Sequence, residues 1–117
     1  LARGLTELIQ RRIGAGVHVK VQVETMVNLT MQEQIRIVRR ADVLLGNHGA
    51  GLTHGLFLED NSMMIEMSCA HGFFPELMKW KPRVQHICHS SMYGRITPQY
   101  WDGIVQMIAN HVKEKGR

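Results

Sequence analysis

A glycine-rich segment near the middle of the chain constrains its fold more than any other feature. Residues 41–53 read ADVLLGNHGAGLT, in which the apolar run Val43–Leu45 predicts a short buried strand. The glycine turn, residues Gly46–Gly51, removes side-chain bulk where the backbone has to turn sharply and lie open to a partner. An apolar helical segment, Leu52–Leu58, is expected to leave that turn, so the segment predicts a strand, a turn and a helix in succession.

Polar side chains at the glycine turn favour a ligand there. A helix that begins in a turn points its unpaired N–H groups and positive dipole end into the opening, which favours an anion such as phosphate. Asn47, His48 and Thr53 add hydrogen-bonding side chains at the rim. A tight structural turn without a ligand is the alternative. The predicted ligand-binding residues here are Asn47, His48, Gly49, Ala50, Gly51, Leu52 and Thr53.

The rest of the chain predicts helices that alternate with strands. Helices are expected at Leu1–Arg12, after Thr30, at Phe73–Trp80 and after Thr97, and strands at Val17–Val23, Met63–Met67 and Val84–Cys88. Such alternation implies parallel strand crossovers, and hence an α/β, Rossmann-like parallel sheet with helices on both faces. Functional loops in such sheets lie at the carboxyl ends of the strands, where the glycine turn is expected.

Two of the helices have clear caps and apolar faces. Thr30 and Glu33 predict a capping box, and Thr97 is expected to cap the last helix. The inward residues are expected to be Met31, Ile35 and Val38 on the first of these helices, and Trp101, Ile104, Val105, Ile108 and Val112 on the last.

Glu66 is a second candidate for ligand binding. A carboxylate at the end of an apolar strand needs a partner, and ribose hydroxyls are one choice while a neighbouring backbone group or arginine is the other. His54 either joins the site or faces solvent, and His18 and His111 are expected at the surface. Because no Asp-any-Asp motif occurs, we expect neither a metal ion nor another cofactor.

The composition narrows the class of protein. A chain of 117 residues forms at most one domain, and its net charge of +4 is scattered, with few aromatic residues between the basic ones. Nucleic-acid binding is therefore not expected. No run approaches the ~20 apolar residues of a membrane span. Because the chain has neither an initiating methionine nor a signal peptide, we expect it to be a piece of a longer protein.

Two features leave alternatives open. Cys69 and Cys88 are either buried thiols or a disulfide, since their spacing does not match a zinc site. Asn28 begins a glycosylation sequon, although its Thr30 already has a second role as a helix cap.

The segment ADVLLGNHGAGLTHGLFL, followed by the strand ending in Ile65-Glu66, resembles the signature region of the family-61 glycosyltransferases. That family includes plant xylosyl- and arabinosyltransferases and animal O-linked N-acetylglucosaminyltransferases of the secretory pathway. The likeness is clear from about Leu29 to Met67. The chain departs from the family pattern at His54, where asparagine is usual, and at residues 59–61, which replace a proline-rich turn.

The resemblance implies the C-terminal, donor-binding half of a GT-B-type glycosyltransferase. The donor would be a nucleotide sugar, expected to be a UDP-sugar, and the acceptor a glycan or protein hydroxyl, with inversion and without a metal ion. The glycine turn would hold the diphosphate, and a missing N-terminal domain would bind the acceptor and supply the base. The piece alone would be inactive, and the whole enzyme would lie in the lumen of the Golgi or endoplasmic reticulum. A non-catalytic nucleotide-binding or interaction module is the rival hypothesis.

Overall fold

The structure, a computed structural model, describes residues 2–46, 50–67, 73–90 and 97–115. The chain divides into two compact units, each described here by itself. Unit 1 combines Leu1–Thr25 with Ile96–Arg117, and unit 2 is the continuous segment Met26–Arg95.

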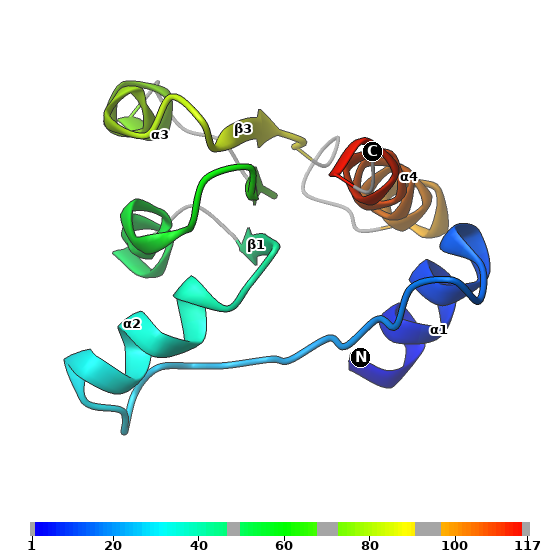
Figure 1. Cartoon of the computed structure of the whole chain (residues 1–117), viewed down its shortest axis with the longest axis horizontal. Coiled ribbons are helices and arrows are strands. Elements are labelled where there is room, and N and C mark those ends of the chain that lie inside the picture. Colours follow the sequence, from blue (N-terminus) through cyan, green and yellow to red (C-terminus); the bar gives the residue numbers. More distant parts are fainter. Residues whose placement is uncertain (1, 47–49, 68–72, 91–96, 116–117) are drawn as a thin grey trace. The chain divides into compact units, whose positions relative to one another are not determined.

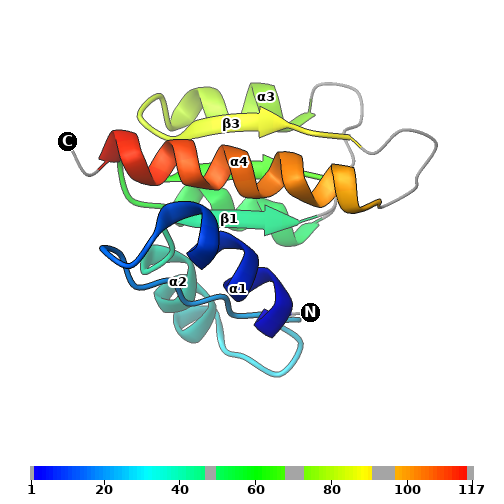
Figure 2. The same ribbon diagram turned by 90° about the vertical axis from the view of Figure 1, so that its right-hand side faces the viewer.

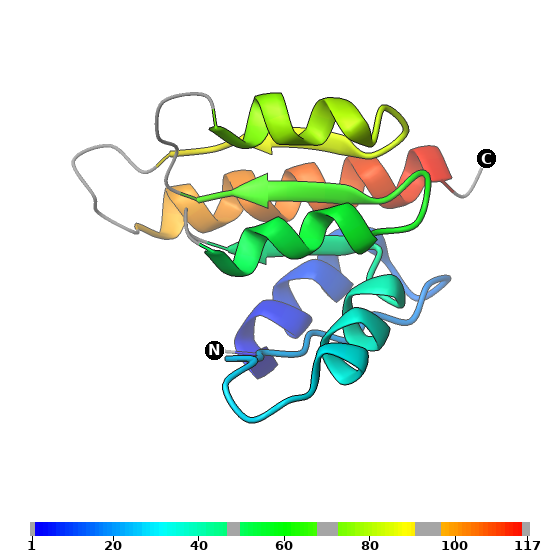
Figure 3. The same ribbon diagram turned by 90° about the vertical axis from the view of Figure 1, so that its left-hand side faces the viewer.

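Unit 2 contains a parallel sheet of three strands in the order β1-β2-β3 (Figure 1). The strands are β1 (Val43–Gly46), β2 (Met63–Glu66) and β3 (Gln85–Cys88), and Figure 2 shows β1 and β3 running in the same direction. The helices between and before them are α2 (Met31–Arg39), the 3₁₀ helix η1 (Ala50–Phe57), α3 (Phe73–Leu77) and the 3₁₀ helix η2 (Met78–Trp80). The helices of this unit lie on one face of its sheet (Figure 3). The α/β, Rossmann-like class is therefore confirmed, while helices on the opposite face and a GT-B arrangement stay predictions.

The core of unit 2 forms where these helices meet the sheet. Its buried members are Val38, Leu58, Met64, Met78 and Val84. All four residues of β2, the central strand of the sheet, are buried. Gly55 of η1 lies so close to β2 that an added Cβ would stand 2.6 Å from the sulfur of Met64. A larger residue at this point of η1 would therefore require the buried Met64 side chain to shift.

The predicted capping box of α2 is confirmed. The Thr30 hydroxyl accepts a hydrogen bond from the backbone N–H of Glu33 at 3.1 Å, and the Glu33 carboxylate accepts one from the N–H of Thr30 at 3.1 Å. The bond from the Thr30 backbone has the largest effect on the pKa of Glu33 and lowers it from its ordinary value of 4.5; the bond with the Thr30 side chain lowers it further. The predicted inward face is wrong at Met31, which is 59% exposed, because the first turn of α2 lies away from the core that buries Val38.

Unit 1 consists mainly of two packed helices, α1 (Ala2–Ile13) and α4 (Pro98–Lys115). Thr97 caps α4 as predicted, since its hydroxyl accepts a hydrogen bond from the N–H of Tyr100 at 3.1 Å. The buried side chains of this unit are Leu5 and Ile9 of α1, with Tyr100, Ile104, Val105, Ile108, Ala109 and His111 of α4. The surface position predicted for His111 is wrong, because that histidine lies on the buried face of α4 and is 7% exposed.

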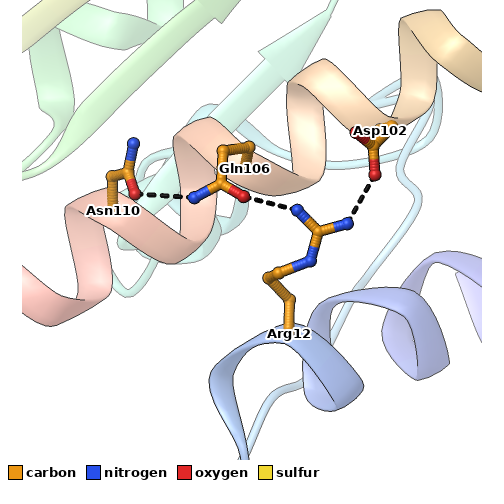
Figure 4. A network of polar contacts seen from close by, with 4 residues as sticks. All are labelled: Arg12, Asp102, Gln106 and Asn110. Carbon is orange, nitrogen blue, oxygen red and sulfur yellow. Dashed lines mark hydrogen bonds and ion pairs between the residues drawn. The ribbon is translucent and has the colours of Figure 1, made fainter.

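Polar side chains also join the two helices of unit 1 (Figure 4). The guanidinium of Arg12 donates to Asp102 at 2.5 Å and to the side-chain oxygen of Gln106. The amide nitrogen of Gln106 in turn donates to Asn110 at 2.8 Å. The Arg12 and Asp102 side chains are 36% and 64% exposed, so this pair orients α1 against α4 and adds little free energy of folding.

The predicted strand at Val17–Val23 is wrong. Its residues form no strand, and Val17 and Val23 are 42% and 62% exposed. The side-chain amide of Gln10 instead donates to the carbonyl of Val17 at 2.7 Å and accepts from the N–H of Val19 at 3.1 Å. A neighbouring strand in a parallel sheet would bond the same two groups. Gln10 of α1 thus bonds two backbone groups of this segment that a neighbouring strand would otherwise bond.

Candidate functional site

The three strands of unit 2 terminate together at one end of the sheet, which we call its carboxyl edge. Gly46 at the end of β1 is the register partner of Glu66 at the end of β2, and Glu66 is the partner of Cys88 on β3. Backbone bonds extend this edge by one residue, from Met67 N–H to the Gly46 carbonyl and from His89 N–H to the Glu66 carbonyl, both at 2.8 Å. Both candidate features of the sequence, the glycine turn and Glu66, therefore belong to the carboxyl edge of the sheet.

The glycine turn leaves β1 at this edge and leads into η1. Asn47, His48 and Gly49 lie outside the described residues, and the side chains of Ala50, Gly51, Leu52 and Thr53 are likewise not described. The backbone of Ala50–Phe57 is helical, which confirms a helix after the turn, although it begins two residues earlier than predicted and is of the 3₁₀ type. A 3₁₀ helix is narrower than an α-helix, which suits the close approach of η1 to the sheet. The ligand contacts of residues 47–53 stay predictions.

Glu66 pairs with a residue that the sequence did not single out. Its carboxylate oxygen Oε1 lies 2.7 Å from Nε2 of His86, and the two side chains are 2% and 14% exposed. Met64 and Glu66, two residues apart, lie on the face of β2 that carries the core, and Met64 is the register partner of His86. The pair therefore crosses from β2 to β3 on the helix-covered face.

His86 is thus a partner of Glu66 in addition to the two protein partners considered above, a backbone group and an arginine. The sequence shows that His86 and Glu66 each lie in a strand, but it does not show the register between β2 and β3. A diagonal contact between two strands becomes visible only when that register is known. Contact between Glu66 and a ribose stays a prediction.

His54 connects η1 to α2. Its Nε2 atom lies 2.6 Å from Oε1 of Gln34, whose amide nitrogen donates to the carbonyls of Met26 at 3.3 Å and Leu29 at 3.0 Å. Because that nitrogen is the donor, Oε1 is the acceptor and His54 Nε2 donates. The half-buried His54 therefore fixes η1, the helix that follows the glycine turn, to the start of α2.

Three further observations concern chemistry in this unit and its neighbour. Cys88 is disulfide-bonded, and the other cysteine of the chain, Cys69, lies outside the described residues. Among the residues that the structure describes, no group of three or more His, Cys, Asp or Glu side chains is placed to hold a metal ion. Within the same residues, no helix is long and apolar enough to cross a membrane.

Two surface hollows are found, one in each unit. One of about 340 Å³, in unit 1, lies between α1 and α4 and includes Leu8 and Trp101 in its lining. The other, of about 510 Å³, lies beside α2 in unit 2. Neither of these two hollows is lined by Glu66 or His86.

Comparison with known proteins points to one family. Residues 3–65 match the family described as Glycosyltransferase 61. The chain is 49% identical over 39 residues to an EGF domain-specific O-linked N-acetylglucosamine transferase of Gallus gallus, which covers 33% of the chain and 7% of that protein. It is 31% identical over 67 residues to a beta-1,2-xylosyltransferase of Arabidopsis thaliana, with 55% and 12% covered.

A third relative extends the similarity over most of the chain. It is the beta-1,2-xylosyltransferase RCN11 of Oryza sativa subsp. japonica, 27% identical over 93 residues, which are 76% of the chain and 16% of that protein. No solved structure matches significantly. The matched part of the chain thus corresponds to between 7% and 16% of the length of these relatives.

Proposed function

Because the chain belongs to the glycosyltransferase 61 family, we propose that it binds the sugar donor in a glycosyltransferase. The donor is a nucleotide sugar, with a UDP-sugar as the first choice. The sugar passes to a hydroxyl of a glycan or protein with inversion at the anomeric carbon and without a metal ion or other cofactor. The observation that carries this proposal is the family match over residues 3–65, which contains β1, the glycine turn and η1.

The position of the glycine turn supports a role in holding the diphosphate. It follows β1 at the carboxyl edge of a parallel sheet, where ligands of open α/β sheets bind. In the proposed complex the backbone N–H groups from Gly49 to Leu52 donate to the phosphates, and His48, Asn47 and Thr53 add side-chain donors. Negative charge grows on the departing nucleoside diphosphate, so the same donors stabilise the transition state.

Glu66 is the proposed partner of the ribose hydroxyls. It is the register partner of Gly46, the residue at which the glycine turn begins, and its carboxylate is bonded to His86. Because the residue is 1% exposed, contact with a ribose requires a displacement of neighbouring groups at this edge. Because Glu66 is proposed to contact the ribose and the glycine turn the diphosphate, the two contacts are tested with different variants.

The complete protein is proposed to have a second, N-terminal domain that binds the acceptor and supplies the catalytic base. We place it in the lumen of the endoplasmic reticulum or Golgi. The disulfide at Cys88 supports this location, because disulfides persist in oxidising compartments and are rare in the cytosol.

The test is calorimetric titration of UDP into the longest soluble form of the protein. Gly51→Val should abolish measurable binding, because a branched side chain blocks the approach of the diphosphate to the backbone. His48→Ala should weaken binding by about 1.5–3 kcal/mol, the contribution of one hydrogen bond to a charged group. The matched controls are Gly16→Val, where an added Cβ meets open space, and His18→Ala, an exposed histidine; both should bind UDP like the wild type.

Equal UDP affinity in the wild type, Gly51→Val and His48→Ala, with all three folded, would remove the glycine turn from the donor site. Glu66→Gln then decides the ribose contact: it should weaken binding of UDP and leave binding of inorganic pyrophosphate unchanged. If the complete protein bound UDP but transferred no sugar, the non-catalytic module would replace the enzyme as the better explanation.

A further inference from the structure

One face of α2 carries a group of basic side chains. Gln32, Arg36 and Arg39 are spaced by four and three residues, which places them on one side of the helix. Arg40, the C-terminal cap of α2, adds a third arginine. The half-buried Ile35 and the carboxylate of Glu59, which follows Leu58, lie beside these side chains. The six residues line the hollow of about 510 Å³ in unit 2, which we call the arginine hollow.

The arginine hollow has an excess of positive charge. Three guanidinium groups line it against one carboxylate, that of Glu59, which pairs with Arg39 at 3.2 Å. Both partners of this pair are about 60% exposed, at 62% and 60%, so the pair is weak and a ligand can compete for it. Within the described part of the chain, the side chains of Arg36 and Arg40 form neither a hydrogen bond nor an ion pair.

Helix C-termini commonly carry arginines without any ligand, because the cations offset the negative end of the helix dipole. Two properties of the arginine hollow go beyond that role. It is a shallow, open hollow whose volume falls inside the range of about 300–1,000 Å³ of small-molecule sites. Its lining also combines guanidinium groups with the amide of Gln32 and the aliphatic side chain of Ile35, which offsetting the helix dipole does not require.

The arginine hollow lies at the opposite edge of the sheet from the glycine turn. Arg40 precedes the first residue of β1, Val43, whereas the turn follows its last residue, Gly46. A four-residue strand is about 13 Å long, so one small ligand does not fill both places.

We propose that the arginine hollow binds an acidic sugar that carries a phosphate or sulfate ester. The guanidinium groups of Arg36 and Arg40 donate to the ester oxygens, a geometry in which arginine forms paired bonds to oxyanions. The apolar face of the sugar ring lies on Ile35, and its hydroxyls bond to Gln32 and Glu59. The lining thus matches each part of such a ligand: anion, apolar ring face and hydroxyls.

The test is a titration followed by backbone amide NMR shifts with four probes: glucose 6-phosphate, glucose 6-sulfate, glucose and inorganic sulfate. Both esters should give saturable shifts at α2, stronger than those of inorganic sulfate, while glucose gives none. Arg36→Gln and Arg40→Gln should each lower ester affinity about tenfold or more, the loss of one charged hydrogen bond. Glutamine keeps helix propensity, so folding should not change.

Arg11→Gln is the matched control, since Arg11 is an exposed arginine in the last turn of α1 and its loss changes the net charge equally. It should leave ester affinity unchanged. Equal weakening by Arg11→Gln would show a response to net charge alone and would overturn the proposal. Equal affinity for inorganic sulfate and the esters would refute the sugar contacts, and shifts at α2 that do not saturate would refute the site.

Discussion

Removing His86 should destabilise unit 2 more than the loss of an exposed histidine normally would. His86→Ala takes away the group that lies 2.7 Å from the Glu66 carboxylate and leaves that carboxylate 1% exposed to solvent. Desolvating a carboxylate without its partner is costly because the charge has lost both water and its hydrogen bond.

Two general values bracket the expected loss. Hydrogen bonds to charged groups contribute about 1.5–3 kcal/mol, and breaking one partner of a buried ion pair costs about 3–5 kcal/mol. Glu66 also interacts with groups besides His86, which partly compensates the charge. We therefore expect His86→Ala to lower the free energy of unfolding by about 2–4 kcal/mol, between those values.

The assay is urea unfolding followed by far-ultraviolet circular dichroism, with a double-mutant cycle. His86→Gln keeps an N–H donor and should retain most of the stability. In a Glu66→Gln background the buried charge is gone, so His86→Ala should cost only the lost packing of the ring. The cycle should therefore give a coupling energy of about 1.5–3 kcal/mol between the two residues.

The opposite pattern would refute this reasoning. If His86→Ala and His86→Gln lost the same stability, the hydrogen bond would contribute nothing and the ring would act by packing alone. A coupling energy below about 0.5 kcal/mol would lead to the same conclusion, because that is the error within which independent sites add.

Three other predictions concern unit 2 and its helices. Gly55→Ala should destabilise by about 1–3 kcal/mol in a urea titration, because its Cβ would stand 2.6 Å from the sulfur of the fully buried Met64, whereas Gly4→Ala in α1, with open space around it, should not destabilise at all. A loss shared equally by both variants would contradict the close approach. Thr30→Ala should cost about 0.5–2 kcal/mol through the lost cap. Because folding lowers the pKa of Glu33, this carboxylate stabilises the folded state above its ordinary pKa of 4.5, and the stabilisation disappears as the pH falls through the lower folded pKa. Glu33→Gln should remove that part of the dependence of the free energy of unfolding on pH. An unchanged pH profile in this variant would refute the prediction.

Local signals predicted the local structure well. The capping box at Thr30 and the cap at Thr97 were readable because each depends on residues at most three apart along the chain. The strands β1 and β2 were readable from their short apolar runs, β3 was predicted one residue too long, and the alternation of all three with helices indicated parallel pairing. The pattern at Val17–Val23 failed because alternation shows that a segment can be extended but not that a partner strand exists.

The sequence by itself determined the order of helices and strands in unit 2, the position of the glycine turn after β1, and a family resemblance that the match over residues 3–65 confirms. Only the tertiary structure decided that His86 is the partner of Glu66 and that His111 is buried. The reason is physical. Caps and turns depend on neighbours along the chain, whereas the partner of a buried charge depends on the register between strands, which packing sets across a separation of 20 residues.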